Sequence, residues 1–346
     1  MDRIRVLVTG AGSGVGQGIV KALRASNLSL TIISTDITPM NAALFRADES
    51  VLLPKVEEKG ALPVIKSILR ARQVDVVMIG SEFDLEFFTR HKEEIEKDAN
   101  VLVVVSPLET VLIADDKYLT AGYLKKNGLP FAESYLPRSY EDVAKKAQEW
   151  EYPVLLKPRR GTSSRHVYVI HDEDELHALF ERVPTPMLQQ LVAMPSHALG
   201  DEYTCGIFKC RDGRLLGPCT ARRTLRGGHS WIVEVGIFEE LHPLLLAIGE
   251  KLPIMGSLNV QLMIGPHGPV PFEFNARFSG TTAVRAHFGF NEPEMAIRDY
   301  FLKEDLAQPV IRKGLALRYP EEVFLEGLGA NDLKEPFPKG EVRAWF

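Results

Sequence analysis

Polar residues alternate along a predicted strand near the C-terminal end of the chain, within the stretch GSLNVQLMIGPHGPVPFEFNARFSG. Glu273, Asn275 and Arg277 stand two residues apart, so their side chains project from the same face of that strand. A hairpin through Gly265–Gly268 would bring Gln261 of the preceding strand close to Glu273. Carboxylate and amide oxygens suit magnesium, and an arginine beside them can neutralise charge on a transferred phosphoryl group. The pattern predicts a phosphoryl-transfer site; the alternative is an exposed polar strand face held by a salt bridge.

A second stretch with the potential for chemistry is the glycine-rich turn VLVTGAGSGVGQGIV at residues 6–20. Glycines between a strand and a helix let backbone N–H groups approach a phosphate, and Asp36 after the next strand is spaced to bind a ribose. The turn resembles that of short-chain dehydrogenases. That family's catalytic Tyr-x-x-x-Lys is missing, because none of the nine tyrosines has a lysine four residues later. We therefore interpret the glycines first as a means of tight turning and close helix packing.

The elements that position these residues follow from hydrophobic periodicity. The first third of the chain alternates short runs rich in Val and Ile with helical patterns, which predicts a parallel sheet with crossover helices on both faces. A small α+β module follows, in which the runs YPVLLKP and HVYVI flank a Gly/Ser turn. From EYTCGIFKC onward strands dominate, separated by turns such as RDGR and GPHGP. The predicted fold class is α/β, with a second, α+β part.

Composition limits the class of protein. A chain of 346 residues is longer than one hydrophobic core usually serves, which indicates two or three domains. With 45% hydrophobic residues, 25% charged residues and a net charge of -5, the chain is typical of a globular protein and not of a nucleic-acid binder. The three cysteines lack metal-ligand spacing, so reduced thiols and a cytoplasmic location are expected. No apolar run reaches the roughly 18 residues of a membrane span, so no membrane partner is expected.

The polar strand pair resembles the ATP-grasp superfamily, in particular the carbamoyl phosphate synthetase large chain and carboxylate-amine ligases of the pyrrolysine-biosynthesis type. The motifs that carry the resemblance are Asn259-Val260-Gln261 and Glu273-Phe274-Asn275-Ala276-Arg277-Phe278-Ser279. Further landmarks extend the resemblance over roughly residues 1–310. It implies a Rossmann-like domain at 1–112 and an ATP-grasp domain at 113–310 with a mobile lid at about 119–188. Residues 311–346 would form a tail or a small β-rich cap.

The resemblance also implies which residues contact ATP. Lys117, in the pair Asp116-Lys117, and Lys157, at the end of an apolar strand, would bind the phosphates together with Ser163 of the loop GTSSRH. The stretch MLQQLV would pair with adenine, and the ribose would bind a carboxylate after it. The residues of these two contacts are Gln190, Leu191, Val192 and Glu202.

The remaining implied roles belong to metal binding and catalysis. Gln261, Glu273 and Asn275 would hold Mg²⁺, or Mn²⁺ in its place. Arg277 would stabilise the transferred phosphoryl group. Arg222, in TARRTLRGGHSW, would contact a phosphate or the substrate carboxylate.

The resemblance implies an ATP-dependent carboxylate-amine or carboxylate-thiol ligase. Such an enzyme forms an acyl phosphate from a small carboxylate, an amino acid by family precedent, and then condenses it with a nucleophile. ADP and phosphate are released, the partners are small molecules, and a homodimer is possible by family precedent. Two alternatives stay open: a non-catalytic ATP-binding sensor, and an NAD(P)-dependent reductase of the short-chain type.

Overall fold

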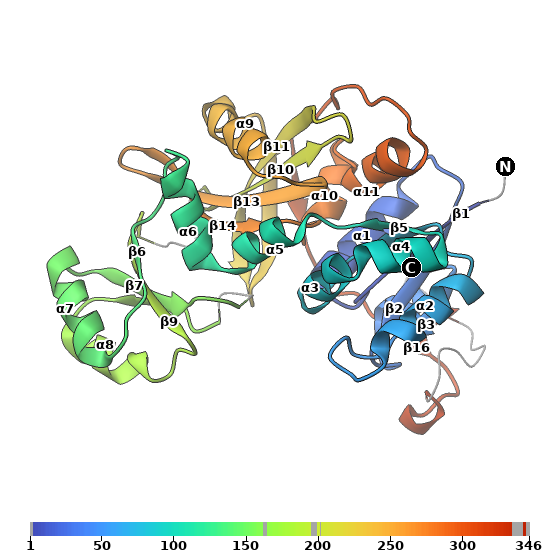
Figure 1. The fold of residues 1–346 in the computed structure, drawn as a ribbon, viewed down its shortest axis with the longest axis horizontal. Helices are drawn as coiled ribbons and strands as arrows, with labels where there is room; N and C mark the ends of the chain where they lie inside the picture. The colour runs from blue at the N-terminus through green and yellow to red at the C-terminus, as the bar shows by residue number, and fades with distance from the viewer. Residues whose placement is uncertain (1–2, 162–164, 195–198, 201, 334–341, 344–346) are drawn as a thin grey trace.

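The computed structural model describes residues 3–161, 165–194, 199–200, 202–333 and 342–343. Within them the chain forms one parallel sheet and two larger antiparallel sheets, so the predicted α/β class with an additional α+β part is confirmed at this level. Figure 1 shows the three sheets in succession across the molecule, with the parallel sheet at one end and the smaller antiparallel sheet at the other.

The parallel sheet is built from the first 104 residues and is covered on both faces, as its Val- and Ile-rich strands predict. Alternate residues of its strands enter two different hydrophobic clusters: Val6 and Val8 lie in one cluster, and Leu7 lies in the other. The strand order is β3 (Glu49–Leu52), β2 (Leu30–Asp36), β1 (Ile4–Val8), β4 (Val76–Met78) and β5 (Leu102–Val104). The helices are α1 (Gly14–Arg24), α2 (Ala61–Ala71), α3 (Glu82–Arg90) and α4 (Lys92–Ala99), with the short turn η1 (Ala42–Phe45).

The smaller antiparallel sheet has four strands and two helices that cover one of its faces. Val154 and Leu156 of β7 pack on these helices, while Leu155 and Lys157 point to the opposite face because side chains alternate along a strand. The strand order is β6 (Ser134–Tyr135), β9 (Pro186–Gln190), β7 (Val154–Pro158) and β8 (Tyr168–Ile170). The helices are α7 (Tyr140–Trp150) and α8 (Glu173–Phe180).

The larger antiparallel sheet has six strands and lies between the other two sheets (Figure 1). Its strand order is β14 (Gly268–Asn275), β13 (Gly256–Gly265), β10 (Glu202–Lys209), β11 (Leu215–Arg226), β12 (His229–Gly236) and β15 (Gly314–Leu317). One face packs against α5 (Leu108–Asp115), α6 (Lys117–Lys126), η2 (Glu239–Leu241) and α9 (His242–Lys251). On the other side α10 (Thr282–His287) and α11 (Glu292–Ala296) pack on α1, followed by η3 (Ile297–Phe301).

A shared core joins the parallel sheet to the six-stranded sheet. Phe208 and Val233 of the six-stranded sheet lie in the same hydrophobic cluster as Val6 and Ile19 of the parallel sheet and α1. The four-stranded sheet has a separate cluster of its own. Leu124 of α6 packs with the six-stranded sheet, so the unit around the four-stranded sheet begins at β6, after the first residues of the predicted lid range.

The described residues of the C-terminal segment form short elements. β15 adds an edge strand to the six-stranded sheet, and β16 (Phe324–Leu325) pairs with β17 (Val342–Arg343) after the turn η4 (Ala330–Asp332). Cys205, Cys210 and Cys219 are buried free thiols, as predicted. None of the described helices combines the length and the apolar character that a membrane crossing requires.

Candidate active site

The polar strand pair forms the hairpin that the sequence predicts. β13 and β14 pair antiparallel, and Gln261 lies opposite Glu273 while Asn259 lies opposite Asn275. The Oε1 atom of Glu273 accepts hydrogen bonds from Gln261 Nε2 and from Asn275 Nδ2, each at 3.1 Å. The carboxylate is therefore fixed by two amides, while its second oxygen is directed to other groups.

Two lysines approach this carboxylate from different elements. Lys117, in the first turn of α6, lies with Nζ 3.9 Å from Glu273 Oε2 and donates to the Gly161 carbonyl at 2.8 Å. Asp116 caps this helix by accepting hydrogen bonds from the backbone N–H groups of Tyr118 and Leu119, which fixes the start of the helix at Lys117. The two lysines thus gather positive charge around the Glu273 carboxylate.

Lys157 of β7 is the more buried of the two lysines, with 3% of its surface exposed. Its Nζ donates to Gln189 Oε1 at 2.8 Å and lies 5.9 Å from the centre of the Phe272 ring. Burial, and then the neighbouring charge of Lys117, lower the pKa of Lys157 to about 7, against the opposing attraction of Glu273. An anionic ligand beside Lys157 would favour its protonated form and so raise its pKa again.

Glu202 and Arg223 complete the polar wall on β10 and β11. Arg223 Nε donates to Glu202 Oε1 at 2.9 Å, and its Nη2 donates to Gln261 Oε1 at 3.0 Å. Arg222, the arginine expected at the site from the sequence, points the other way and pairs with Glu234 at 2.7 Å. Strand alternation places its neighbour, Arg223, on the side of Glu202.

One cavity of about 480 Å³ brings most of the predicted residues together between the four-stranded and the six-stranded sheets. Its walls include Leu155, Val169, Met263 and Phe272, which give it an apolar slot beside the charged groups. The predicted residues that line it are Lys117, Lys157, Gln190, Leu191, Val192, Glu202, Gln261 and Glu273. Apolar walls with a few convergent polar groups are typical of small-molecule sites.

Three described residues of the predicted set stand apart from this lining. Arg222 faces Glu234, as described, and Ser163 lies outside the residues that the structure describes. Asn275 and Arg277 border a smaller hollow beside the cavity. There Arg277 forms an ion pair with Glu82 of α3 and donates to the Phe278 carbonyl at 2.8 Å. The ion pair connects the site to the parallel sheet.

Three contributing residues lie outside the set that was assigned roles from the sequence: Gln189, Arg223 and Glu82. The sequence offers Arg223 beside the favoured Arg222, and it offers Glu82, after a strand of the parallel sheet, either as part of an acceptor pocket or as a helix cap. Arg223 was recognisable in principle, because it pairs with Glu202 in register across neighbouring strands. Gln189 follows from its position opposite Leu155 in the neighbouring strand. No sequence signal identifies the ion pair of Glu82 with Arg277, since 195 residues separate the two.

The donor set around Glu273 fits a magnesium ion that also binds phosphate. Mg²⁺ in nucleotide sites is usually held by one or two carboxylates, with phosphate oxygens and water completing its coordination. The structure supplies one carboxylate, Glu273, and two amide side chains, Gln261 and Asn275, which both donate hydrogen bonds to it. Among the described residues there is no group of three or more His, Cys, Asp or Glu side chains that could hold a metal alone. The ion would therefore depend on the phosphates for much of its coordination.

The glycine turn at the parallel sheet is explained by close packing. The loops after β1 and β4 approach each other so closely that a Cβ at Gly80 would lie closer than 3.0 Å to the Thr9 carbonyl. A Cβ at Gly16 would meet the Gly10 carbonyl in the same way, and Gly10 has φ +48°. Ser13 caps α1 by accepting from Gly16 N and donates to the Gly80 carbonyl. These contacts agree with the packing interpretation of the glycines.

Comparison with known proteins identifies relatives for the whole chain. Residues 6–104 match the family "PylC-like, N-terminal domain". The carbamoyl phosphate synthase large chain of Thermoanaerobacter sp. strain X514 is 21% identical over 309 residues, 82% of this chain and 28% of that protein. The large chain of Gemmatimonas aurantiaca is 21% identical over 361 residues, 97% of this chain and 31% of that protein. The chain thus spans less than a third of the length of these curated relatives.

Solved structures share the fold at low sequence identity. The biotin carboxylase domain dimer of Hydrogenobacter thermophilus 2-oxoglutarate carboxylase, in complex with MgADP, ADP and bicarbonate, aligns with a TM-score of 0.75. It is 14% identical, and the match covers 95% of this chain and 81% of that one. Carboxyaminoimidazole ribonucleotide synthase from Aspergillus clavatus, complexed with ATP, aligns with a TM-score of 0.71 at 16% identity, covering 91% and 81%.

The sequence relatives, the family match and the structural neighbours agree with one another. They confirm the resemblance to ATP-grasp proteins of the carbamoyl phosphate synthetase and pyrrolysine-biosynthesis type that the strand motifs predict.

Proposed function

We propose that this ATP-grasp chain is an ATP-dependent ligase that activates a small carboxylate as an acyl phosphate and joins it to an amine or a thiol. The observation that carries the proposal is the single cavity onto which the side chains suited to phosphate, metal and ribose converge from two sheets. Two structural neighbours, solved in complex with ADP and with ATP, support it. The reaction class is that of an ADP-forming ligase.

ATP would lie in this cavity with its parts matched to different walls. Lys117 and Lys157 would bind the phosphates as cations, and Glu202 would accept hydrogen bonds from the ribose hydroxyls. The base would occupy the apolar slot, where Gln190–Val192 line the edge. Ser163 stays a predicted phosphate contact.

Magnesium would be held by Glu273 together with Gln261 and Asn275, and Mn²⁺ could take its place. When bound, the ion neutralises phosphate charge and orients the transferred group. The residues of this chain act around it: Lys117 is 3.9 Å from the Glu273 carboxylate and so stands where phosphate and metal charges would meet.

The proposed chemistry has two balanced steps. A carboxylate oxygen of the substrate attacks the γ-phosphorus, the bond from this phosphorus to the bridging oxygen breaks, and ADP leaves. The nucleophile then attacks the acyl carbon and gives up its proton. The bond from this carbon to the oxygen that bridges to phosphorus breaks, and inorganic phosphate leaves with that oxygen. Arg277 would stabilise the transferring group, and Arg223 rather than Arg222 is the arginine placed on the cavity wall.

The domain boundaries belong to the same proposal. Residues 1–112 would form the Rossmann-like domain, residues 113–310 the ATP-grasp domain, and the unit around the four-stranded sheet the lid that closes over the nucleotide. The tail at 311–346 stays assigned to a cap. A homodimer is proposed on the precedent of the structural neighbour solved as a domain dimer.

The sensor alternative keeps one observation in its favour, because Arg277 is paired with Glu82 and lies outside the cavity lining. A sensor would bind ATP without transferring phosphate. The reductase alternative is disfavoured, because the backbone packs too closely at this turn to leave room for a Cβ, and this packing already accounts for the glycines.

The experiment is an assay of ADP release by the purified protein with MgATP, across pools of amino acids and other small carboxylates, with and without pooled amines and thiols. We expect ADP release that depends on a pool and disappears on chelation of the metal. The variant Glu250→Gln, which removes a carboxylate from the exposed surface of α9, is the matched control for the variant Glu273→Gln and should keep full activity. ATP binding without release in any pool would favour the sensor, and binding of NADPH in place of ATP would favour the reductase.

A further inference from the structure

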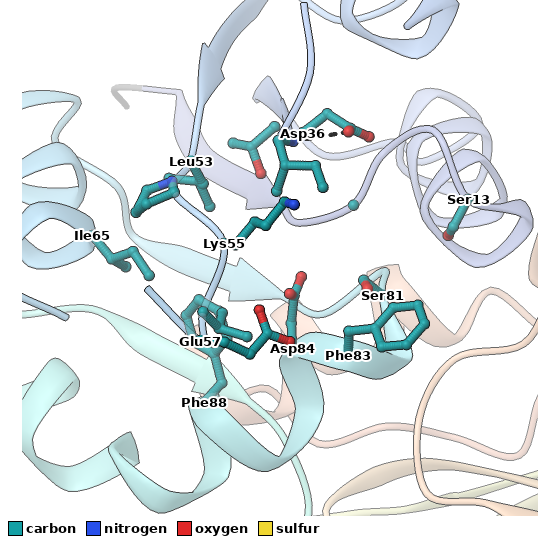
Figure 2. Close-up of a pocket in the computed structure, with 15 residues that line it drawn as sticks. Ser13, Asp36, Leu53, Lys55, Glu57, Ile65, Ser81, Phe83, Asp84 and Phe88 are labelled. Atoms are coloured by element: carbon teal, nitrogen blue, oxygen red, sulfur yellow. Dashed lines mark hydrogen bonds between the residues drawn. The ribbon is translucent and has the colours of Figure 1, made fainter. Parts of the chain in front are cut away.

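A second cavity, of about 260 Å³, lies at the carboxyl edge of the parallel sheet, away from the proposed nucleotide site. Figure 2 shows side chains around one space that come from the glycine turn, the end of β2, the loop after β3, α2, and α3 with the residue before it. Its lining includes Ser13, Asp36, Lys55, Glu57, Phe83 and Asp84. The nucleotide assignment uses none of these residues.

The position of this cavity is set by the topology of the sheet. The chain runs from β1 to β2 and β3 on one side and returns to β4 and β5 on the other, so the strand order reverses between β1 and β4. Ligands of open parallel sheets bind in the crevice at such a reversal of strand order. Here Gly10 follows β1 and Ser81 follows β4, and both line the cavity.

Asp84 is a carboxyl group in largely apolar surroundings, which include Leu53, Ile65 and Phe88. Burial, assisted by repulsion from Glu57 and Asp36, raises the pKa of Asp84 to about 6, although a hydrogen bond with Thr9 opposes the shift. Lys55 also lines this cavity. A carboxyl group in this state is stabilised by a cationic ligand.

Asp36 has a different role from Asp84, because its oxygens are already engaged. They accept from Ile37 N and Asn41 Nδ2 at 2.8 Å and from Gly12 N at 3.2 Å. Asp36 therefore holds the turn together and adds negative charge, while Asp84 and Glu57 are the carboxylates placed to meet a ligand.

The mouth of the cavity carries large apolar side chains that face solvent. Phe83 is 79% exposed and Ile37 is 55% exposed, and both line the cavity. An aromatic face beside a carboxylate is the combination that recognises an alkylammonium group, because the ring attracts the cation and the apolar stem is removed from water.

The cavity is coupled to the proposed reaction site through one helix. Glu82, at the start of α3, pairs with Arg277 beside the cavity of the six-stranded sheet, and the next two residues, Phe83 and Asp84, line the second cavity. A ligand that contacts both residues would lie beside the turn that fixes Arg277.

We propose that this second cavity binds the nucleophilic substrate by an ammonium group at the end of an apolar stem, held by Asp84, Glu57 and Phe83. The assignment of the ligand as the nucleophile rests on the proposed ligase function, whereas the binding chemistry does not. The group that reacts is at the other end of the molecule, so the held ammonium stays protonated and forms no bond.

The test is calorimetric titration of the full chain, without ATP, with 1,5-diaminopentane as probe and 1-pentanol and pentanoate as probes lacking the cation. We expect the diamine to bind and the other two to bind at least about tenfold more weakly. Asp84→Asn should weaken diamine binding by about 10-fold to 100-fold, and Glu57→Gln, at an exposed position, by several-fold. Affinity for the diamine should rise as the pH increases through about 6 in the wild type, where Asp84 ionises, and this rise should vanish in Asp84→Asn.

The matched control is Glu86→Gln, which removes a carboxylate from the outer face of the same helix, where Glu86 pairs with Arg90. It should leave diamine binding unchanged. The proposal is overturned if the wild type does not bind the diamine, if pentanol binds equally well, or if Glu86→Gln weakens binding as much as Asp84→Asn and Glu57→Gln do. A separate titration with MgATP keeps the two ideas apart: diamine binding without ATP binding would refute the ligase function and leave the ammonium site intact.

Discussion

Two networks of polar side chains lie on the same two strands of the six-stranded sheet, and only one of them is sealed from solvent. Thr204 on β10 and Asn259 on β13 contact the fully buried Arg285. Glu202 and Gln261 lie only two residues away on these strands, yet both line the cavity proposed for the nucleotide. A displacement of two residues along a strand therefore separates a structural network from a candidate binding site.

In the sealed network most of the polar groups bond to one another, although Arg285 Nε is buried without a hydrogen-bond partner. Arg285 Nη1 lies 3.1 Å from Glu292 Oε1, and both side chains are 0% exposed. Ser257 Oγ donates to the same carboxylate at 2.6 Å. Burial raises the pKa of Glu292, while the Arg285 charge opposes this shift. Such a network leaves little hydrogen-bonding capacity for a ligand.

The open network contains the same kinds of groups with part of their surface free. The side chains of Glu273 and Glu202 are 23% and 22% exposed, and each contacts a cation at one oxygen. Because these groups face a cavity, a ligand can replace their present partners. The comparison teaches that burial of the whole network, and not residue type, separates the stabilising role from the binding role.

The largest expected effect comes from breaking the sealed network. Arg285→Leu leaves Glu292 buried without its counter-charge, which should lower the free energy of unfolding by about 3–5 kcal/mol in a urea titration. Removing both charges in Arg285→Leu/Glu292→Leu should recover most of that loss, because the uncompensated charge is gone. A loss below about 1 kcal/mol in the single variant would show that the sealed network is not structural.

Lys157→Met should give the opposite outcome in the open network. ATP affinity, measured by calorimetry, should fall by about 1.5–3 kcal/mol, the usual contribution of a hydrogen bond to a charged group. The free energy of unfolding should not fall, because within the described part of the chain no carboxylate directly contacts the buried ammonium, and burial itself disfavours its charged form. A variant that unfolds readily and still binds ATP normally would reverse the assignment.

The pH dependence of the same lysine gives a third and smaller effect. The pKa of Lys157 is about 7 in the folded chain and 10.5 in its ordinary state, so the unfolded chain binds more protons between these values. Its contribution makes stability rise with pH across this window, and that contribution is lost as the pH falls through 7. Anionic phosphates should restore the proton, so ATP binding at about pH 8 should take up nearly one proton.

Calorimetry in buffers of different ionisation enthalpy measures that proton directly. The uptake should disappear in Lys157→Met. Equal uptake in the variant and the wild type would place the titrating group elsewhere.

The smallest expected effect separates the two neighbouring arginines of β11. Arg222 pairs with Glu234 at a partly exposed position, so Arg222→Gln should change the free energy of unfolding by less than about 1 kcal/mol and leave ATP affinity unchanged. Arg223→Gln should weaken ATP binding, because Arg223 connects Glu202 with Gln261 on the cavity wall. Comparable affinities for the two variants would contradict the orientation seen on this strand.

Local patterns were sufficient to predict much of the fold and the centre of the site. The Val- and Ile-rich runs predicted a covered parallel sheet, and the glycines at 265 and 268 predicted the hairpin that sets Gln261 opposite Glu273. These features depend on residues close in sequence or on simple periodicity. Such features can therefore be predicted from a single amino-acid sequence.

The features that the sequence did not yield depend on register between distant strands. Which of Arg222 and Arg223 faces Glu202 follows from the pairing of β10 with β11, and a shift by one residue would exchange them. The hydrogen bond of Lys157 with Gln189 and the ion pair of Glu82 with Arg277 likewise join elements that meet only in the folded chain. No local pattern contains that information.

The most direct measurement is made on Glu273→Gln, with the rate of substrate-dependent ADP release and the free energy of unfolding determined on the same preparation. If the open network serves phosphoryl transfer, ADP release should fall by about 100-fold or more while the free energy of unfolding changes by less than about 1 kcal/mol. Retained ADP release would contradict the role of Glu273. A large loss of stability would show that the open network holds the fold together as the sealed one does.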